Sequence, residues 1–244
     1  MSGLAERVAI ITGGGSGIGR AVASTMAALG AHVVVCGRRG DVVAALAREA
    51  TAAGLTMRAV AADVAVAADV DRVVAEAYDN YGAVDIVVNN AGVFGNGAIH
   101  DHDIDTWDRV MAANLRGPFL MCRAVLPIMR AQRRGHIVNI SSEAALAHYP
   151  TNGAYGVSKH ALNALGEYVQ RENQDHGIQV NTVCPGVVLT DMADQLGAVE
   201  PANCLVPEDV AELVLWLVTR RDNVKIGAPV LVQTMRSPWR AEEG

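Results

Sequence analysis

The sequence predicts an α/β fold, a doubly wound parallel sheet of about seven strands with helices on both faces. Short apolar runs alternate with longer segments in which apolar residues recur at helical spacing. The short runs are apolar throughout, as expected for strands covered on both faces. No internal repeat, charge run or Pro/Ser-rich linker divides the chain. We therefore expect one domain over residues 1–244.

The elements follow one another as βα units. The first predicted strand, VAIIT at residues 8–12, is a short β-branched run. The first two helices are each followed by a glycine, Gly30 and Gly54, a residue common after a last helical turn. The predicted strands span residues 8–12, 32–36, 57–62, 85–89, 136–141, 178–183 and 229–232. The predicted helices span residues 20–30, 41–53, 67–81, 107–114, 118–133, 153–175 and 208–219.

Composition excludes several classes of partner. The net charge of −6 argues against a nucleic acid or an anionic membrane surface, and no apolar run approaches the length of a membrane span. The four cysteines show neither disulfide-like nor metal-ligand spacing, so we expect buried thiols in a reducing, cytoplasmic compartment. They are Cys36, Cys122, Cys184 and Cys204.

A glycine-rich segment, TGGGSGIG at residues 12–19, lies between the first strand and the first helix. In a doubly wound sheet this turn binds phosphate, because glycines allow close backbone approach and the helix N-terminus attracts an anion. The alternative is a permissive loop that only connects the two elements. The position of the glycine-rich segment, after the first strand and before a helix, favours the phosphate-binding interpretation.

The spacing Thr12-Gly13-x-x-x-Gly17-x-Gly19 resembles the TGxxxGxG pattern of the short-chain dehydrogenase/reductase family, which has a Rossmann-like fold. Further motifs of that family occur in the same order. They are Asn89-Asn90-Ala91-Gly92, Asn114, Ser142, Tyr155-x-x-x-Lys159 and Asn181-x-x-x-Pro185-Gly186. The resemblance implies a ketoreductase or alcohol dehydrogenase that uses a nicotinamide cofactor.

Four residues carry the expected chemistry. Tyr155 and Lys159 are four apart on a predicted helix, so the lysine ammonium is expected to lower the pKa of the tyrosine hydroxyl, a general acid/base. The resemblance implies that Ser142 orients the carbonyl oxygen, although the neighbouring Ser141 competes for this role. It also implies that Asn114 relays protons through its backbone and a water. The alternative for Tyr155 and Lys159 is an ordinary surface pair.

The resemblance also implies a set of cofactor-binding residues, to which Tyr155 and Lys159 belong because Lys159 would bind the nicotinamide ribose. Asp63 would meet the adenine ring; its alternative is a turn aspartate at a strand end. The remaining expected positions are Gly13, Ser16, Gly17, Ile18, Gly19, Val64, Asn90, Ala91, Gly92, Pro185, Gly186, Val188 and Thr190.

The end of the second strand bears on cofactor choice. Enzymes that use NAD usually place a carboxylate there to bind the ribose 2′-hydroxyl. Here Gly37 is followed by Arg38 and Arg39, which favours the 2′-phosphate of NADP(H). NAD(H) stays possible if both arginines are merely solvated and Asp41 binds the ribose.

Other features set the remaining expectations. We expect no metal site; the His100-Asp101-His102-Asp103 run precedes a helix and resembles the family's polar approach to it. The segment of residues 187–206, expected to cover the substrate, is short, which favours a small or polar carbonyl or alcohol. The family pattern also implies a homo-oligomer, either a tetramer or a dimer. Alternative functions are a related epimerase or dehydratase, and a non-catalytic cofactor-binding scaffold.

Overall fold

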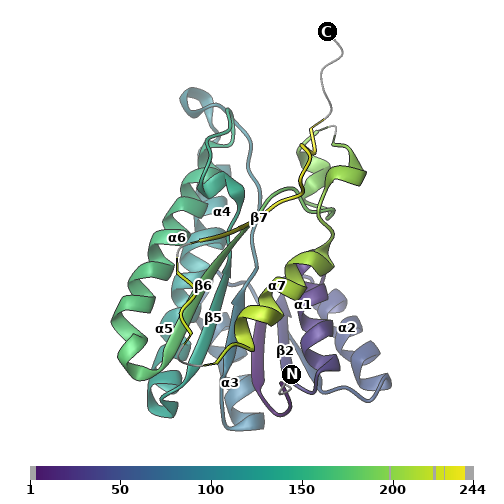
Figure 1. The fold of residues 1–244 in the computed structure, drawn as a ribbon, viewed down its shortest axis with the longest axis vertical. Helices are drawn as coiled ribbons and strands as arrows, with labels where there is room; N and C mark the ends of the chain where they lie inside the picture. Colours follow the sequence, from purple (N-terminus) through teal and green to yellow (C-terminus); the bar gives the residue numbers. More distant parts are fainter. Residues whose placement is uncertain (1–3, 198, 222–223, 228, 240–244) are drawn as a thin grey trace.

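The fold is built on one sheet of seven strands, all paired in parallel (Figure 1). The computed structural model describes residues 4–197, 199–221, 224–227 and 229–239. The strand order is β3-β2-β1-β4-β5-β6-β7. The strands are β1 Val8–Thr12, β2 His32–Gly37, β3 Met57–Ala61, β4 Ile86–Asn89, β5 Gly135–Ile140, β6 Ile178–Pro185 and β7 Val230–Val232.

Helices cover both faces of this sheet, which confirms the predicted fold class. Successive strand residues face opposite sides: Ile11 packs in the cluster under α1, α2 and α7, and Ile10 in the cluster under α3, α5 and α6. The helices are α1 Gly17–Ala28, α2 Gly40–Ala52, α3 Ala67–Tyr81, α4 Ile104–Met111, α5 Gly117–Gln132, α6 Gly153–Asn173 and α7 Pro207–Val218.

The predicted helices at 107–114 and 118–133 are joined. A π-helical turn over Ala112–Arg116 connects α4 directly to α5, where the sequence, with Gly117 and Pro118, had suggested a break. A π-turn inserts an extra residue into the helical ladder without ending the helix. The start of α4 lies at residue 104 because Asp103 caps it, its carboxylate accepting from the Thr106 backbone N–H at 2.7 Å.

The order of the strands creates a crevice. The chain leaves β3 at one edge of the sheet and re-enters with β4 on the other side of β1. The carboxyl ends of β1 and β4 are therefore neighbours from which the chain departs in opposite directions. In open parallel sheets, ligands bind at such a switch point.

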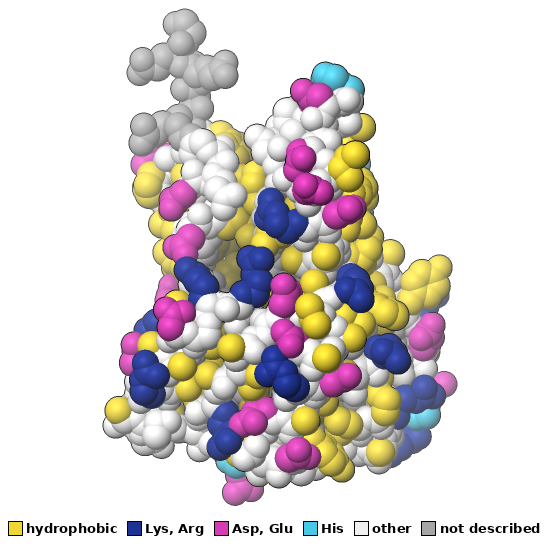
Figure 2. All heavy atoms as spheres, turned by 180° about the vertical axis from the view of Figure 1, so that it is seen from behind, with side chains coloured by type: hydrophobic (Ala, Val, Ile, Leu, Met, Phe, Trp, Pro, Cys, Tyr) yellow, Lys and Arg dark blue, Asp and Glu magenta, His cyan; other side chains and the backbone are white. Residues whose placement is uncertain are grey.

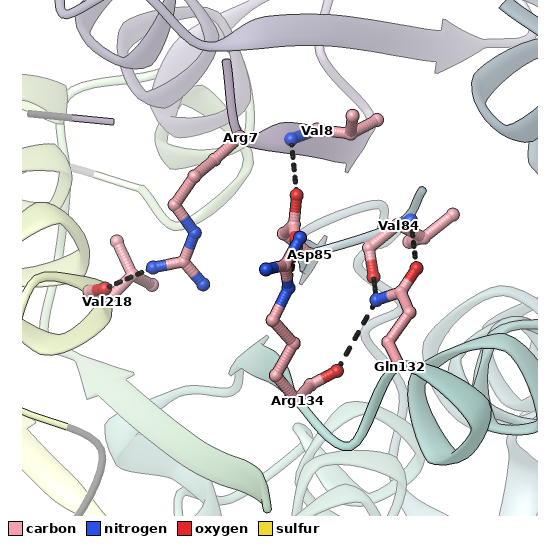
Figure 3. Close-up of polar contacts among 7 residues, drawn as sticks. All are labelled: Arg7, Val8, Val84, Asp85, Gln132, Arg134 and Val218. Carbon is pink, nitrogen blue, oxygen red and sulfur yellow. Dashed lines mark hydrogen bonds and ion pairs between the residues drawn. The ribbon is translucent and has the colours of Figure 1, made fainter. Parts of the chain in front are cut away.

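At the opposite end of the sheet, a buried carboxylate joins three segments (Figure 3). Asp85 is 2% exposed and accepts hydrogen bonds from the backbone N–H of Val8 and from Nε of Arg134, both at 2.9 Å. Beside it, the Gln132 side chain pairs with both backbone groups of Val84. These bonds fix the start of β1 against β4 and the end of α5.

The segment at residues 187–206 packs against the C-terminal part of the chain, and both rise above the sheet in Figure 1. Val199 forms an antiparallel bridge with Trp239, and the Glu200 N–H donates to the Pro238 carbonyl at 2.7 Å. Of these stretches, Ala198 and Ala228 lie outside the described residues.

Among the described helices, none combines the length and hydropathy needed to cross a bilayer.

Replacing Asp85 with alanine is expected to lower the free energy of unfolding by about 1–3 kcal/mol, because the buried Val8 N–H loses its acceptor. Arg134 is half exposed and regains water, so its lost ion pair adds little. Urea unfolding measures the change. Asp79→Asn, on the exposed side of α3, is the control and should stay within about 0.5 kcal/mol. Equal stability of the two variants would contradict the role given to Asp85.

Candidate active site

One cleft of about 890 Å³ opens at the carboxyl ends of the strands, at the upper end of the size range of ligand pockets. Figure 2 shows a hollow between the two upper projections of the molecule, with Lys or Arg side chains beside it. Every predicted site residue except Gly19 and Asn114 lines this cleft. The lining predicted positions are Gly13, Ser16, Gly17, Ile18, Arg38, Arg39, Asp63, Val64, Asn90, Ala91, Gly92, Ser142, Tyr155, Lys159, Pro185, Gly186, Val188 and Thr190.

The glycine turn brings bare backbone to the cleft. Gly13 and Gly17 have φ values of +64° and +51°, in the left-handed region that favours glycine. Ser16 precedes α1 without a capping bond from its side chain, and the first turn of α1 carries no acidic residue. The positive end of the helix dipole is thus not neutralised locally, which suits it to an anionic group.

Gly19 has a different place from the one predicted. It is buried behind the turn, and a Cβ at this position would lie 2.4 Å from the Gly13 carbonyl oxygen. Its lack of a side chain lets α1 pack tightly against the turn. Its effect on a bound ligand is therefore indirect.

Asn90 ties the turn to the end of β4. Its side-chain amide donates to the backbone oxygens of Thr12 and Gly13 at 3.0 and 3.2 Å. In return, Thr12 Oγ1 accepts from the backbone N–H groups of Asn90 and Ala91, both at 3.0 Å. The motifs at residues 12–19 and 89–92 thus form one hydrogen-bonded unit at the switch point.

Arg38 and Arg39, which follow β2, line the same end of the cleft as the glycine turn. Arg39 donates to Ser16 Oγ at 3.1 Å and lies 4.0 Å from the Asp191 carboxylate, while Arg38 is exposed at the cleft wall. Asp41, the alternative ribose ligand, is exposed in the first turn of α2 and is not among the lining residues.

Asp63 has the contacts of a turn aspartate and also faces the cleft. Its Oδ1 accepts from the Ala65 N–H at 2.9 Å, as in a turn at a strand end, and its own N–H donates to Asp69 at 2.8 Å. It also lines the cleft next to Val64.

Ser142, Tyr155 and Lys159 meet at the other end of the cleft. The hydroxyls of Ser142 and Tyr155 are hydrogen-bonded, and Lys159 Nζ lies 5.6 Å from the centre of the Tyr155 ring. Lys159 is 4% exposed, and Nζ donates to the Ile140 carbonyl at 2.9 Å. Ser141 points elsewhere: its hydroxyl donates to the Lys159 backbone oxygen at 3.2 Å. The geometry thus favours Ser142 over Ser141 as the partner of Tyr155.

The expected fall in the pKa of Tyr155 does not occur in the ligand-free protein. Burial raises the pKa of Tyr155 to about 12, and the hydrogen bond from Ser142 only partly offsets it. Burial also lowers the pKa of Lys159 to about 8. The pKa of Tyr155 thus shifts in the direction opposite to the predicted one, because desolvation is its largest cause. Near neutral pH the tyrosine is therefore a proton donor.

Asn114 lies in the π-helical turn and is fully buried behind the cleft. Its side chain exchanges hydrogen bonds with both backbone groups of Val93, at 2.8 and 3.0 Å, and donates to Ser158 Oγ at 3.0 Å. It therefore joins α4–α5 to α6 close to Lys159. The side chain is engaged in these bonds, which leaves the backbone as the expected route for any proton relay.

Several lining residues were not predicted. Phe94 packs edge-on against Tyr155 with ring centres 5.2 Å apart, and Trp239 reaches the cleft from the C-terminal segment. Arg109 adds a positive charge. Trp239 lies far from the motifs in sequence, and the pairing of its segment with Val199 and Glu200 brings it here. Among the large apolar residues of the 187–206 segment, Met192 and Leu196 line the cleft and Leu205 does not.

The His100–Asp103 run has a structural role in the fold. His102 Nδ1 contacts the Asp103 carbonyl at 3.0 Å, and Asp103 caps α4. Within the part of the chain that the structure describes, no group of three His, Cys, Asp or Glu side chains is placed to hold a metal.

The fold and this cleft agree with comparisons to known proteins. The short chain dehydrogenase family model matches residues 7–201. The chain belongs to this family of enzymes. Among curated relatives of this short-chain dehydrogenase are two from Xanthobacter autotrophicus. A 2-(R)-hydroxypropyl-CoM dehydrogenase is 42% identical over 77% of this chain and 76% of the relative. A 2-(S)-hydroxypropyl-CoM dehydrogenase is 34% identical over 94% of this chain and 96% of the relative.

Solved structures give the same assignment for this short-chain dehydrogenase. A metagenomic short-chain oxidoreductase in complex with NADP has a TM-score of 0.82 and 34% identity, covering 96% of this chain and 99% of its own. Levodione reductase has a TM-score of 0.87 and 29% identity, covering 94% of this chain and 96% of its own.

Replacing Gly19 with alanine is expected to lower Tm by several degrees, because the new Cβ meets the Gly13 carbonyl oxygen, a backbone atom that cannot move without opening the turn. Scanning calorimetry measures the shift. Gly227→Ala is the control, since a Cβ there meets nothing within 4 Å and its φ is not left-handed. A Tm for Gly19→Ala equal to that of the control would contradict the packing described.

Proposed function

We propose that this short-chain dehydrogenase transfers a hydride between a nicotinamide cofactor, preferably NADP(H), and a carbonyl or secondary alcohol. One observation carries the proposal: a single cleft joins the N-terminus of α1 and two arginines to Ser142, Tyr155 and Lys159. The helix terminus and the arginines suit the phosphates of a dinucleotide. Ser142, Tyr155 and Lys159, at the other end of the cleft, suit proton transfer. The relatives from Xanthobacter support this reading, because their names describe dehydrogenation of a 2-hydroxypropyl group.

The residues present fit the cofactor. The backbone of Gly13 and Gly17 and the N-terminus of α1 would hold the pyrophosphate, and Arg38 and Arg39 the 2′-phosphate. Asp63 and Val64 would line the adenine. Pro185, Gly186, Val188 and Thr190 would line the nicotinamide side. A Cβ at Gly17 would lie 2.8 Å from Thr190 Cγ2, so the turn and this loop enclose the same space.

The nicotinamide, when bound, would supply or accept the hydride at the substrate carbon. In reduction, Ser142 donates a hydrogen bond to the carbonyl oxygen, and Tyr155 transfers its hydroxyl proton to that oxygen. The carbonyl becomes an alcohol, and the tyrosinate left behind is stabilised by the Lys159 ammonium. A proton from solvent, relayed past Lys159 and the backbone of Asn114, restores Tyr155.

The pKa values fit the role of Tyr155 as the proton donor in reduction. With the pKa of Tyr155 raised to about 12, the residue is an acid at neutral pH, and Lys159, with a pKa of about 8, is largely an ammonium. Oxidation needs the tyrosinate, which requires the positive charge of an oxidised nicotinamide nearby or a higher pH.

We further propose a cytoplasmic homo-oligomer, a dimer or a tetramer. The four cysteines are all free and buried, as expected in a reducing compartment. Exposed large apolar side chains lie on α5, α6 and α7, among them Phe119, Tyr168 and Trp216, and they suit contact with another subunit.

Tyr155→Phe is expected to lower kcat for carbonyl reduction by about 100-fold or more, because the proton donor is lost while the ring stays. Dinucleotide affinity, measured by NADPH fluorescence, should be nearly unchanged. Tyr78→Phe, at an exposed position on α3, is the control. Turnover of Tyr155→Phe at the control rate would refute the mechanism.

Arg38→Ala combined with Arg39→Ala is expected to weaken NADPH binding about tenfold to 100-fold, because the charge-assisted bonds to a 2′-phosphate are lost. NADH binding should change little, since it lacks this phosphate. Fluorescence titration measures both constants, and Arg48→Ala on α2 is the control. A wild-type preference for NADH, or equal losses for both cofactors, would overturn the choice of NADP(H).

A further inference from the structure

A carboxylate that no part of the proposed mechanism uses lies beside the proton donor. Glu143 directly follows Ser142 and lines the cleft. Its Oε2 lies 3.3 Å from the position that a Cβ would take at Gly186. Glu143 therefore spans the space between the ends of β5 and β6, where the substrate would meet Ser142 and Tyr155.

Two neighbours hold this carboxylate in place. The Gln233 side-chain amide, from the segment after β7, donates to Oε2, and the Tyr149 hydroxyl is hydrogen-bonded to the same carboxylate. A carboxylate offers about four acceptor positions, so these two bonds leave acceptor capacity at the cleft wall. A side chain positioned from two directions keeps its orientation, which is what selective recognition of a ligand requires.

The residues around the Glu143 carboxylate make it selective for ligands that carry a hydrogen-bond donor. Phe94, Leu196 and Trp239 supply apolar walls to the same cleft. Arg109 is the cation that lines it on the α4 side, and its guanidinium donates to the Phe94 carbonyl at 3.5 Å. A carboxylate facing such a space attracts a hydrogen-bond donor and repels a second anion.

We propose that Glu143 determines substrate specificity by accepting a hydrogen bond from a hydroxyl or ammonium group on the carbon next to the reacting carbonyl. The preferred substrates are then α-hydroxy or α-amino ketones, or the matching 1,2-diols and amino alcohols, rather than 2-oxo acids. This inference rests on the proposed function, because it assumes that the carbonyl lies against Ser142 and Tyr155.

The test uses four matched three-carbon carbonyls with NADPH: acetone, hydroxyacetone, aminoacetone and pyruvate. The quantity compared is kcat/KM relative to acetone, in the wild type, in Glu143→Leu and in Glu143→Gln. Glu143→Leu removes the acceptor, so both the hydroxyacetone and aminoacetone ratios should fall about tenfold or more. Glu143→Gln keeps an acceptor without the charge, so the aminoacetone ratio should fall further than the hydroxyacetone ratio. Glu167→Gln, an exposed carboxylate on α6, is the control and should keep the wild-type ratios.

Ratios in both Glu143 variants that match the wild type would overturn the inference, as would a wild-type preference for pyruvate. If the wild type reduces none of the four compounds, the proposed function fails separately. Calorimetric binding of 1,2-propanediol and 2-propanol to the NADP⁺-saturated protein then decides the role of Glu143. Tighter binding of the diol that Glu143→Leu abolishes supports the inference, and equal binding of the two alcohols contradicts it.

Discussion

The candidate active site depends on the hydrogen bonds between Asn90 and the glycine turn that follows β1. The Asn90 amide holds the backbone oxygens of Thr12 and Gly13, while Thr12 Oγ1 holds the backbone of Asn90 and Ala91. These bonds join the ends of β1 and β4, the two strands from which the chain departs in opposite directions. They add to the β1–β4 ladder and fix the glycine turn against the end of β4.

At the other end of the cleft, burial sets the pKa values of Tyr155 and Lys159. Tyr155 and Lys159 are both pushed toward their neutral forms by desolvation, in opposite pKa directions. A tyrosine that keeps its proton and a lysine that can release one near pH 8 form a pair suited to donating a proton and recovering it. The lysine Nζ is held by the Ile140 carbonyl, so its position does not depend on a ligand.

The fold and the glycine turn could be predicted because their causes are local. Apolar periodicity sets the strands and helices, and left-handed φ values at Gly13 and Gly17 need glycine. Contacts between distant segments could not be predicted. Trp239 reaches the cleft through the pairing of its segment with Val199 and Glu200, and the π-turn around Asn114 joins two helices that are predicted to be separate. The pKa of Tyr155 was misjudged because burial depends on the assembled fold.

The central claim is that one cleft places a dinucleotide and a proton donor side by side. A crystal structure of the complex with NADP⁺ tests it most directly. We expect the 2′-phosphate on Arg38 and Arg39, the pyrophosphate on the N-terminus of α1, and the nicotinamide beside Tyr155. Its reacting carbon should leave room for a substrate carbon at about 3–3.5 Å. A dinucleotide bound in the reverse direction, or with its nicotinamide away from Tyr155, would contradict the account.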